Sequence, residues 1–129
     1  MSLLLRNARV VTMNDRLEVV DGDVSVRGGR IAAVGARADT PHDRVIDCDG
    51  DYVLPGLIQT HIHLCQTLFR GYADDMPLMQ WLRTRVWPME AAHTPATLRA
   101  AARLATTELL ASGTTAVLTM ETVHDTDVV

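Results

Sequence analysis

The sequence predicts an α/β fold in which a small β layer precedes a strand–helix–strand unit. Up to residue 54, short β-type runs alternate with turn signals. After Pro55-Gly56, an apolar, β-branched run is followed by two helical stretches and then by another β-type run. The change in pattern at Pro55 predicts one domain over residues 1–54 and a second over residues 55–129.

The first domain is predicted to be a mostly antiparallel β layer. Two glycines between alternating apolar runs favour a hairpin, because glycine tolerates the positive φ of tight turns. The expected elements are a strand over Arg9 to Met13, a turn at Asp21-Gly22, a hairpin turning at Gly28-Gly29 between Val24–Val26 and Ile31–Val34, and a second hairpin turning at Asp49-Gly50 between Val45–Asp47 and Tyr52–Leu54.

The second domain is predicted to be a βαβ unit. A buried strand runs to His63, and a helix begins near Pro77 and stops at Pro88. Thr94-Pro95 opens another helix that Gly113 ends, and Thr114 to Thr119 follows as a strand. The apolar face of the second helix comprises Leu98, Ala101, Ala102, Ala105 and Leu109. A strand, a helical connection and a strand predict a parallel sheet with covered faces.

Length and composition exclude several classes of protein. The 129 residues are too few for a complete (β/α)8 barrel, which takes about 250. With 12 arginines, no lysine and 16 acidic residues, the net charge of −4 argues against a nucleic-acid binder. No apolar run is long enough for a membrane span and no export signal is present, so we expect a cytoplasmic protein with reduced cysteines. Asp125 to Val129 reads as the first turn of a helix, which predicts the front portion of a larger protein.

The strongest chemical motif is His61-Ile62-His63. Side chains two residues apart on a strand point to the same face, so both imidazoles can reach one metal ion. The flanking residues place the pair at the carboxyl end of a strand, where parallel α/β folds carry their sites. The alternative is a pair of histidines on an exposed polar face.

The segment Val53-Leu54-Pro55-Gly56-Leu57-Ile58-Gln59-Thr60-His61-Ile62-His63 resembles the first-strand motif of the amidohydrolase superfamily. The resemblance implies the start of a metal-dependent (β/α)8 barrel, preceded by part of a small antiparallel β-sandwich. The following segments Leu64–Gly71, Ala73–Asp75, Trp81-Leu82 and Trp87–Glu90 are similar to aminohydrolases of adenine nucleosides. These include the deaminases of S-adenosylhomocysteine, methylthioadenosine and 5′-deoxyadenosine.

The resemblance also implies roles for individual residues. His61 and His63 match two ligands of a mononuclear zinc site, which holds iron in some relatives. Glu90 matches an acidic residue that accepts hydrogen bonds from the ribose hydroxyls, and Gln66 occupies a position beside the substrate ring. The implied reaction is hydrolytic loss of ammonia from C6 of adenine. The remaining ligand and proton-transfer residues belong to later strands, so the missing C-terminal part is an expected partner; the complete protein could form a homo-oligomer.

Other interpretations of these residues remain open. Gln66 also favours a triazine or guanine-type hydrolase of the same superfamily, while Glu90 disfavours it. Glu90 could instead be solvated and Gln66 could be bonded to backbone. A small cupin-like metal-binding module is another alternative. Such a module requires a glutamate at one of the positions that Thr67 and Leu68 occupy here. A non-catalytic fragment that needs the rest of the chain is a further alternative.

For four more residues, the sequence favours a structural role over a role in the site. Cys65 is expected to be a small buried hydrophobe. His42 and His93 lie in turn or cap contexts and are expected to be solvated. Glu121, within Met120 to His124, is expected to lie in a polar loop after the last strand; the alternative is that this segment contributes a residue to the rim of the site.

Overall fold

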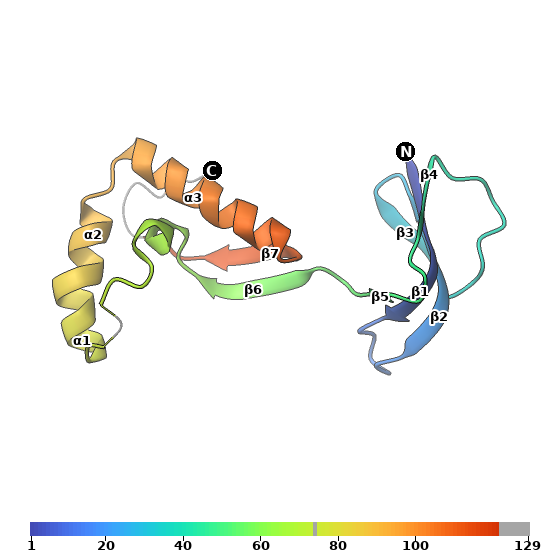
Figure 1. The fold of residues 1–129 in the computed structure, drawn as a ribbon, viewed down its shortest axis with the longest axis horizontal. Helices are drawn as coiled ribbons and strands as arrows, with labels where there is room; N and C mark the ends of the chain where they lie inside the picture. The colour runs from blue at the N-terminus through green and yellow to red at the C-terminus, as the bar shows by residue number, and fades with distance from the viewer. Residues whose placement is uncertain (74, 122–129) are drawn as a thin grey trace. The chain divides into compact units, whose positions relative to one another are not determined.

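The computed structural model describes residues 1–73 and 75–121. The chain forms two units, Met1–Pro55 and Gly56–Val129 (Figure 1). The helical turn predicted over residues 125–129 lies outside the described residues. No helix in the described ranges is both long and apolar enough to cross a membrane.

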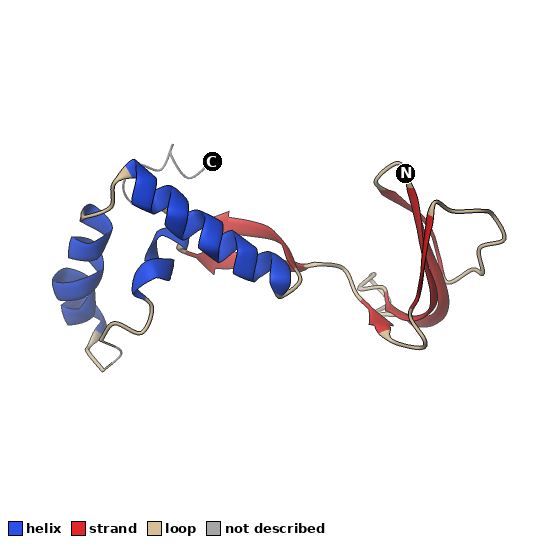
Figure 2. Cartoon of the chain, turned by 45° about the horizontal axis from the view of Figure 1, so that its top comes forward, coloured by secondary structure: helices blue, strands red, loops and turns tan. Residues whose placement is uncertain are grey.

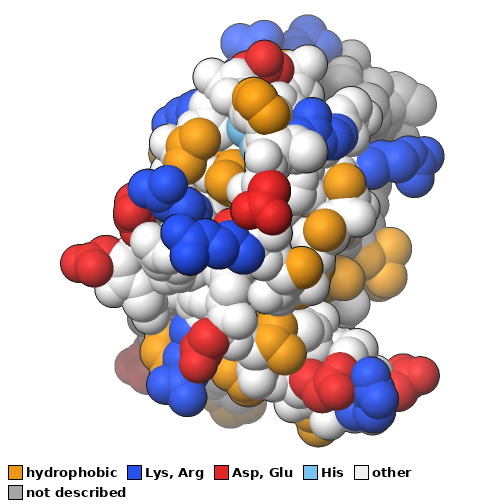
Figure 3. Space-filling view, turned by 90° about the vertical axis from the view of Figure 1, so that its right-hand side faces the viewer, with side chains coloured by type: hydrophobic (Ala, Val, Ile, Leu, Met, Phe, Trp, Pro, Cys, Tyr) orange, Lys and Arg blue, Asp and Glu red, His pale blue; other side chains and the backbone are white. Residues whose placement is uncertain are grey.

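The first unit is one mixed β-sheet with the strand order β3-β2-β1-β4, and β5 also pairs with β1 (Figure 1). Alternate residues of its two long strands form the apolar core, in which Ala8, Val10 and Val24 are buried. The strands are β1 (Ser2–Val11), β2 (Val19–Arg27), β3 (Arg30–Val34), β4 (Arg44–Asp47) and β5 (Tyr52–Val53). On the face drawn in Figure 3, arginine and acidic side chains lie interspersed with hydrophobic ones.

The hairpin predicted at Gly28-Gly29 is confirmed. β2 and β3 pair antiparallel from Arg27 and Arg30 onward, and the two glycines adopt φ of +57° and +75°. Both values lie in the left-handed region that a two-residue hairpin turn requires. The strand predicted over Arg9 to Met13 overlaps β1 only as far as Val11, and β1 begins much earlier, at Ser2.

The hairpin predicted at Asp49-Gly50 is wrong, although both flanking strands exist. β4 and β5 each pair parallel with β1 and occupy successive stretches of the same edge. The turn between them instead follows β1, because the amides of Cys48 and Gly50 donate to the carbonyls of Arg6 and Asn7 at 2.8 Å. Asn7 has φ of +56° where the register of β1 shifts, and the loop follows that irregularity.

The turn predicted at Asp21-Gly22 is also wrong, because both residues lie inside β2. A Cβ atom on Gly22 would lie 2.1 Å from the carbonyl oxygen of Gly35. The glycine therefore permits a close approach of two backbone segments, a role that the sequence pattern does not distinguish from a turn.

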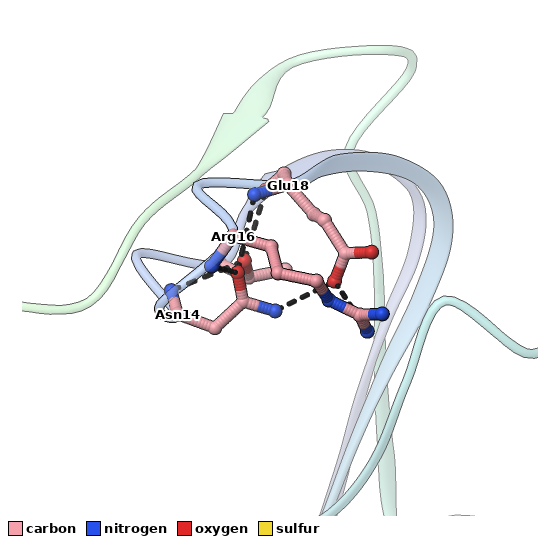
Figure 4. A network of polar contacts seen from close by, with 4 residues as sticks. Asn14, Arg16 and Glu18 are labelled. Atoms are coloured by element: carbon pink, nitrogen blue, oxygen red, sulfur yellow. Dashed lines mark hydrogen bonds and ion pairs between the residues drawn. The ribbon is translucent and has the colours of Figure 1, made fainter.

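Side-chain hydrogen bonds close the loop between β1 and β2 (Figure 4). The Asn14 side-chain oxygen accepts from the amides of Arg16 and Glu18 at 3.2 Å, and its amide nitrogen donates to Glu18 at 2.7 Å. Arg16 donates to the same Glu18 carboxylate at 3.1 Å. Asn14 thus replaces backbone hydrogen bonds that the loop would otherwise lack.

Asp23 ties the sheet to the loop that follows β3. Its side chain is 3% exposed and accepts from the amides of Asn7 at 3.1 Å and Ala38 at 3.0 Å. The bond from Ala38 lowers the pKa of Asp23; burial opposes this effect, and the bond from Asn7 adds to it, so that the pKa lies below its ordinary value.

We expect Asp23→Asn to destabilise the protein at neutral pH and to flatten its acid denaturation. A carboxyl whose pKa is lower in the folded state stabilises above its unfolded pKa, near 3.9, and loses that contribution as the pH falls through the folded value. Urea unfolding followed by circular dichroism between pH 7 and pH 2 measures this. The control is Asp21→Asn, since the Asp21 side chain is 82% exposed on the same strand. Equal pH dependence in the two variants would contradict the role given to Asp23.

The second unit contains the predicted parallel βαβ unit. Strands β6 (Leu57–Ile62) and β7 (Thr114–Thr119) pair in parallel, and α3 (Pro95–Ala111) connects back to β7 along one face of the pair (Figure 2). The start of α3 is confirmed, since Thr94 and Thr97 form a reciprocal capping box. Its end is confirmed as well, because Gly113 follows the helix with φ of +85°.

The helix predicted to stop at Pro88 continues through it. The segments α1 (Leu78–Trp81), η2 (Leu82–Val86) and α2 (Trp87–Ala91) follow one another without a break (Figure 1). η2 is a π-helical turn in which the amide of Trp87 donates to Leu82. A wider turn relieves the clash between a proline ring and the carbonyl of the preceding turn, so the helix passes Pro88.

Helix α3 packs on a short 3-10 helix, η1 (Leu64–Phe69), that directly follows β6. The buried side chains at this contact are Leu64, Ala102 and Ala105, with Ile62 and Leu109 beside them. Leu98 and Ala101 are fully buried, as the predicted apolar face requires. This packing places η1, and the residues on either side of it, at the carboxyl end of β6.

Candidate metal centre

The two predicted metal ligands lie at the carboxyl end of β6. His61 is within the strand and His63 is one residue beyond it. His63 keeps an extended backbone, with φ −125° and ψ 99°, so the alternation of the strand continues through it. Both imidazoles therefore lie on the same side of the strand, with ring centroids 5.6 Å apart and ring planes at 72°.

This separation fits a shared metal ion. A zinc–nitrogen bond of about 2.0–2.1 Å puts each ring centroid roughly 3 Å from the ion, so two ligating rings have centroids less than roughly 6 Å apart. The observed 5.6 Å satisfies that limit, and the large angle between the ring planes lets the two nitrogens converge. Imidazole nitrogen is among the ligand types that bind zinc in proteins.

A backbone hydrogen bond orients the ring of His63. Its Nδ1 lies 2.6 Å from the carbonyl oxygen of Met120, just past the end of β7. A carbonyl only accepts, so Nδ1 carries the proton and Nε2 of a neutral ring keeps its lone pair. A carbonyl that fixes the tautomer in this way is typical of metal-binding histidines.

Glu121 lies beside His63, in the segment for which the sequence favoured a polar loop over a residue at the rim of the site. Its carboxylate accepts from the amides of Leu64 and Cys65 at 2.9 Å each, and from the hydroxyl of Thr119. Burial raises the pKa of Glu121, but these hydrogen bonds outweigh it and hold the pKa below its ordinary value. The residue is thus ionised at neutral pH, half-buried against the first turn of η1. The rest of the predicted loop, residues 122–124, lies outside the described residues.

The two predicted substrate-binding residues contact each other. Glu90 is only 3% exposed, and its Oε1 accepts from the Gln66 side-chain amide at 2.8 Å. The solvated alternative for Glu90 is therefore wrong, and the described partner of the Gln66 amide is a side chain rather than the backbone. The Cys65 thiol lies 3.7 Å from the same Oε1.

Cys65 is 1% exposed, as predicted for a small buried side chain. Burial, followed by the neighbouring carboxylates of Glu121 and Glu90, raises the pKa of its thiol far above the ordinary value. Cys65 is therefore a protonated thiol and a poor nucleophile. Both cysteines of the chain are free.

His93 was predicted to be solvated but is 8% exposed. Its Nε2 donates to the Cys65 carbonyl at 2.8 Å, and its Nδ1 lies 3.1 Å from the hydroxyl of Thr97. The ring therefore links the start of α3 to η1. The signal that could have indicated burial is its place between the buried Glu90 and the capping box, because a helix-to-helix corner must satisfy its polar groups internally. His42 is half-buried and bonds to Ser25 at 2.7 Å.

A hollow of about 420 Å³ opens beside His63 and Gln66, between η1 and α3. Its other lining residues include Arg70 and Glu108, which form a two-pronged ion pair at 2.7 and 2.9 Å. His61 and Glu90 are not among the described residues that line it. Of the two predicted metal ligands, His63 therefore borders the hollow.

Within residues 1–73 and 75–121, no group of three or more His, Cys, Asp or Glu side chains is arranged to hold a metal ion. A catalytic zinc site takes three protein ligands and an open position. The two histidines would therefore need at least one further protein ligand to form such a site.

A model of the amidohydrolase family matches residues 52–129, which is more than half of the chain. The chain belongs to the amidohydrolase family. Among curated relatives of this amidohydrolase chain, a 5′-deoxyadenosine deaminase of Methanococcoides burtonii is 42% identical over 115 residues, covering 88% of this chain and 26% of the relative. A 5-methylthioadenosine/S-adenosylhomocysteine deaminase of Thermococcus kodakarensis is 42% identical over 120 residues, covering 93% and 28%. The chain thus spans about a quarter of the length of these amidohydrolases.

Solved structures of two further proteins are similar to this amidohydrolase chain. A zinc-bound adenosine deaminase from Xanthomonas campestris is 34% identical with a TM-score of 0.86, over 97% of this chain and 30% of that one. A mutant atrazine chlorohydrolase from Arthrobacter aurescens, in complex with zinc and atraton, is 28% identical with a TM-score of 0.79, over 93% and 29%. Both hold zinc, and neither supports iron as the alternative metal.

Proposed function

We propose that this chain is the N-terminal part of a zinc-dependent aminohydrolase that deaminates an adenine nucleoside. The observation that carries the proposal is the His61–His63 pair, with rings 5.6 Å apart at the end of a parallel strand and with Nε2 of His63 left for a metal. The names of the relatives at 42% identity supply the reaction and the class of substrate.

In this proposal, His61 and His63 hold the metal together with ligands from the remainder of the protein. Bound zinc supplies Lewis acidity, which lowers the pKa of water towards 7 and so provides a nucleophile at neutral pH. The Met120 carbonyl keeps the proton of His63 on Nδ1, and the lone pair of Nε2 would then be available to a metal. The residues that transfer protons to and from the substrate belong to the remainder of the protein.

Glu90 is proposed to bind the ribose of the substrate. Gln66 is proposed to lie beside the adenine ring. A carboxylate can accept hydrogen bonds from two vicinal hydroxyls. The Gln66 amide already donates to Glu90, which would hold the carboxylate at a fixed orientation before substrate binds.

We also propose that each unit is part of a larger fold. Strands of a parallel sheet are normally covered on both faces, yet Ile58 and Leu118 are 71% and 68% exposed here. We therefore propose that β6 and β7 are the first two strands of a (β/α)8 barrel completed by later residues, with 55–129 as its first β/α units. Residues 1–54 are proposed to be part of a β-sandwich. The cytoplasmic location and the homo-oligomer remain predictions.

A triazine or guanine-type hydrolase of the same family is the second candidate, because Gln66 lies beside the site and the atrazine chlorohydrolase has a similar fold. A panel of substrates separates the two. We expect the complete zinc-loaded protein to release ammonia from 5′-deoxyadenosine, methylthioadenosine or S-adenosylhomocysteine faster than from guanine or an aminotriazine. The reverse order would favour the second candidate, and release from none of them would contradict both candidates.

A further inference from the structure

The ends of β6 and β7 are joined by a set of hydrogen bonds that surround His63. The amide of Met120 donates to the Ile62 carbonyl at 3.1 Å, and the Met120 carbonyl accepts from the His63 ring at 2.6 Å. Glu121, the next residue, accepts from the two amides that follow His63. Consecutive residues of one strand end therefore hold the residue before His63, its ring, and the backbone after it.

The Glu121 carboxylate uses both of its oxygens in this arrangement. Oε1 accepts from the Leu64 amide and the Thr119 hydroxyl, and Oε2 accepts from the Cys65 amide. These amides belong to the first turn of η1, where N–H groups have no partner inside the helix. The residue that caps η1 is His63, and its side chain makes no capping hydrogen bond. The Glu121 carboxylate, two residues after the end of β7, thus supplies the cap that the local sequence lacks.

We infer that Glu121 is a positioning residue for the metal ligand His63; this inference rests on the proposed function. The strand ends at Ile62 and η1 begins at Leu64, so His63 is the single residue between two elements. The position of its ring therefore depends on how firmly the backbone on either side of it is held. Metal coordination tolerates ligand displacements of only about 0.2 Å. By joining η1 to β7, Glu121 keeps the backbone beside His63 at a constant distance from the Met120 carbonyl that orients the ring.

Glu121→Gln in the complete protein is the test. The amide keeps the volume of the side chain, but its NH2 group cannot accept from a backbone N–H, so one of the two bonds to η1 is lost. We expect zinc affinity, measured by competition with a chelator, to fall about 10–100-fold. We also expect the visible absorption of the cobalt-substituted protein to change, because that spectrum depends on the arrangement of the ligands. Glu108→Gln is the matched control: its carboxylate accepts from Arg70 on the exposed side of α3, and its variant should match the wild type in both measurements.

The outcomes distinguish this inference from the proposed function. If Glu121→Gln binds zinc with wild-type affinity and gives the wild-type cobalt spectrum, the positioning role is wrong while the metal site stands. If the wild type binds no zinc, or if His63→Ala binds it equally well, the metal site itself is wrong and the inference falls with it. Should Glu121→Gln not fold by circular dichroism, Thr119→Val replaces it, since it removes the hydroxyl that contacts the Glu121 carboxylate and, at 3.3 Å, the Ile62 carbonyl before His63. Zinc affinity should then fall about fivefold, and no change would overturn the inference.

Discussion

Alanine in place of His63 is expected to abolish zinc binding by the complete enzyme and to lower kcat/KM for an adenine nucleoside by roughly 10³-fold or more. A metal acting as a Lewis acid stabilises the transition state by several kcal/mol, and each 1.36 kcal/mol is about tenfold in rate. His63 is the proposed ligand whose tautomer is fixed by its 2.6 Å bond to the Met120 carbonyl. Metal content after gel filtration and steady-state kinetics with saturating zinc measure the two effects.

The control for this experiment is His42→Ala. His42 is a half-buried histidine of the first unit that bonds to Ser25 and to the carbonyl of Thr40. Its loss should reduce stability without changing the zinc stoichiometry or the kinetics. Wild-type zinc content in His63→Ala would contradict the assignment of this residue as a ligand.

The second large effect is expected for Glu90→Gln, which should lower kcat/KM for ribosides by about 10²-fold. A hydrogen bond to a charged group contributes about 1.5–3 kcal/mol, and Glu90 is proposed to accept from the ribose hydroxyls. Glutamine is preferred to alanine because its side-chain oxygen can still accept from Gln66, so the packing around the 2.8 Å contact is preserved.

A substrate that lacks both ribose hydroxyls isolates the role of Glu90. The wild-type enzyme should turn over a 2′,3′-dideoxy nucleoside about as poorly as Glu90→Gln turns over the riboside. The variant should show little further loss with the dideoxy compound, because both changes remove the same interaction. Fully additive losses would mean that Glu90 acts elsewhere, for example only in holding Gln66.

The features that the sequence predicted correctly depend on short-range patterns. The hairpin at Gly28-Gly29 and the capping box at Thr94 each need only a few neighbouring residues, and their geometry follows from φ preferences and local hydrogen bonds. The histidine pair could be predicted in the same way, because i and i+2 on a strand always share a face. The extended backbone of His63 preserves that relation one residue beyond the strand.

The features that it missed depend on contacts between residues far apart in the chain. Glu121 lies 57 residues from Leu64, and His93 lies 28 residues from the Cys65 carbonyl that it contacts. The parallel pairing of β4 with β1 joins residues about 41 apart, such as Leu3 and Arg44. Composition and periodicity indicate that polar groups exist at these positions but not which partner satisfies them. The continuation of the helix through Pro88 was missed for a related reason, since it depends on a π-helical turn formed by the preceding residues.

Hydrolysis of 5′-deoxyadenosine by the complete zinc-loaded protein in ¹⁸O-labelled water tests the proposed deamination most directly. We predict that one ammonia is released for each nucleoside consumed. The product should carry a single labelled oxygen at the carbon that bore the amino group. Removal of zinc by a chelator should stop both. A protein that binds zinc through His61 and His63, yet releases no ammonia from any adenine nucleoside, would contradict the proposed deamination.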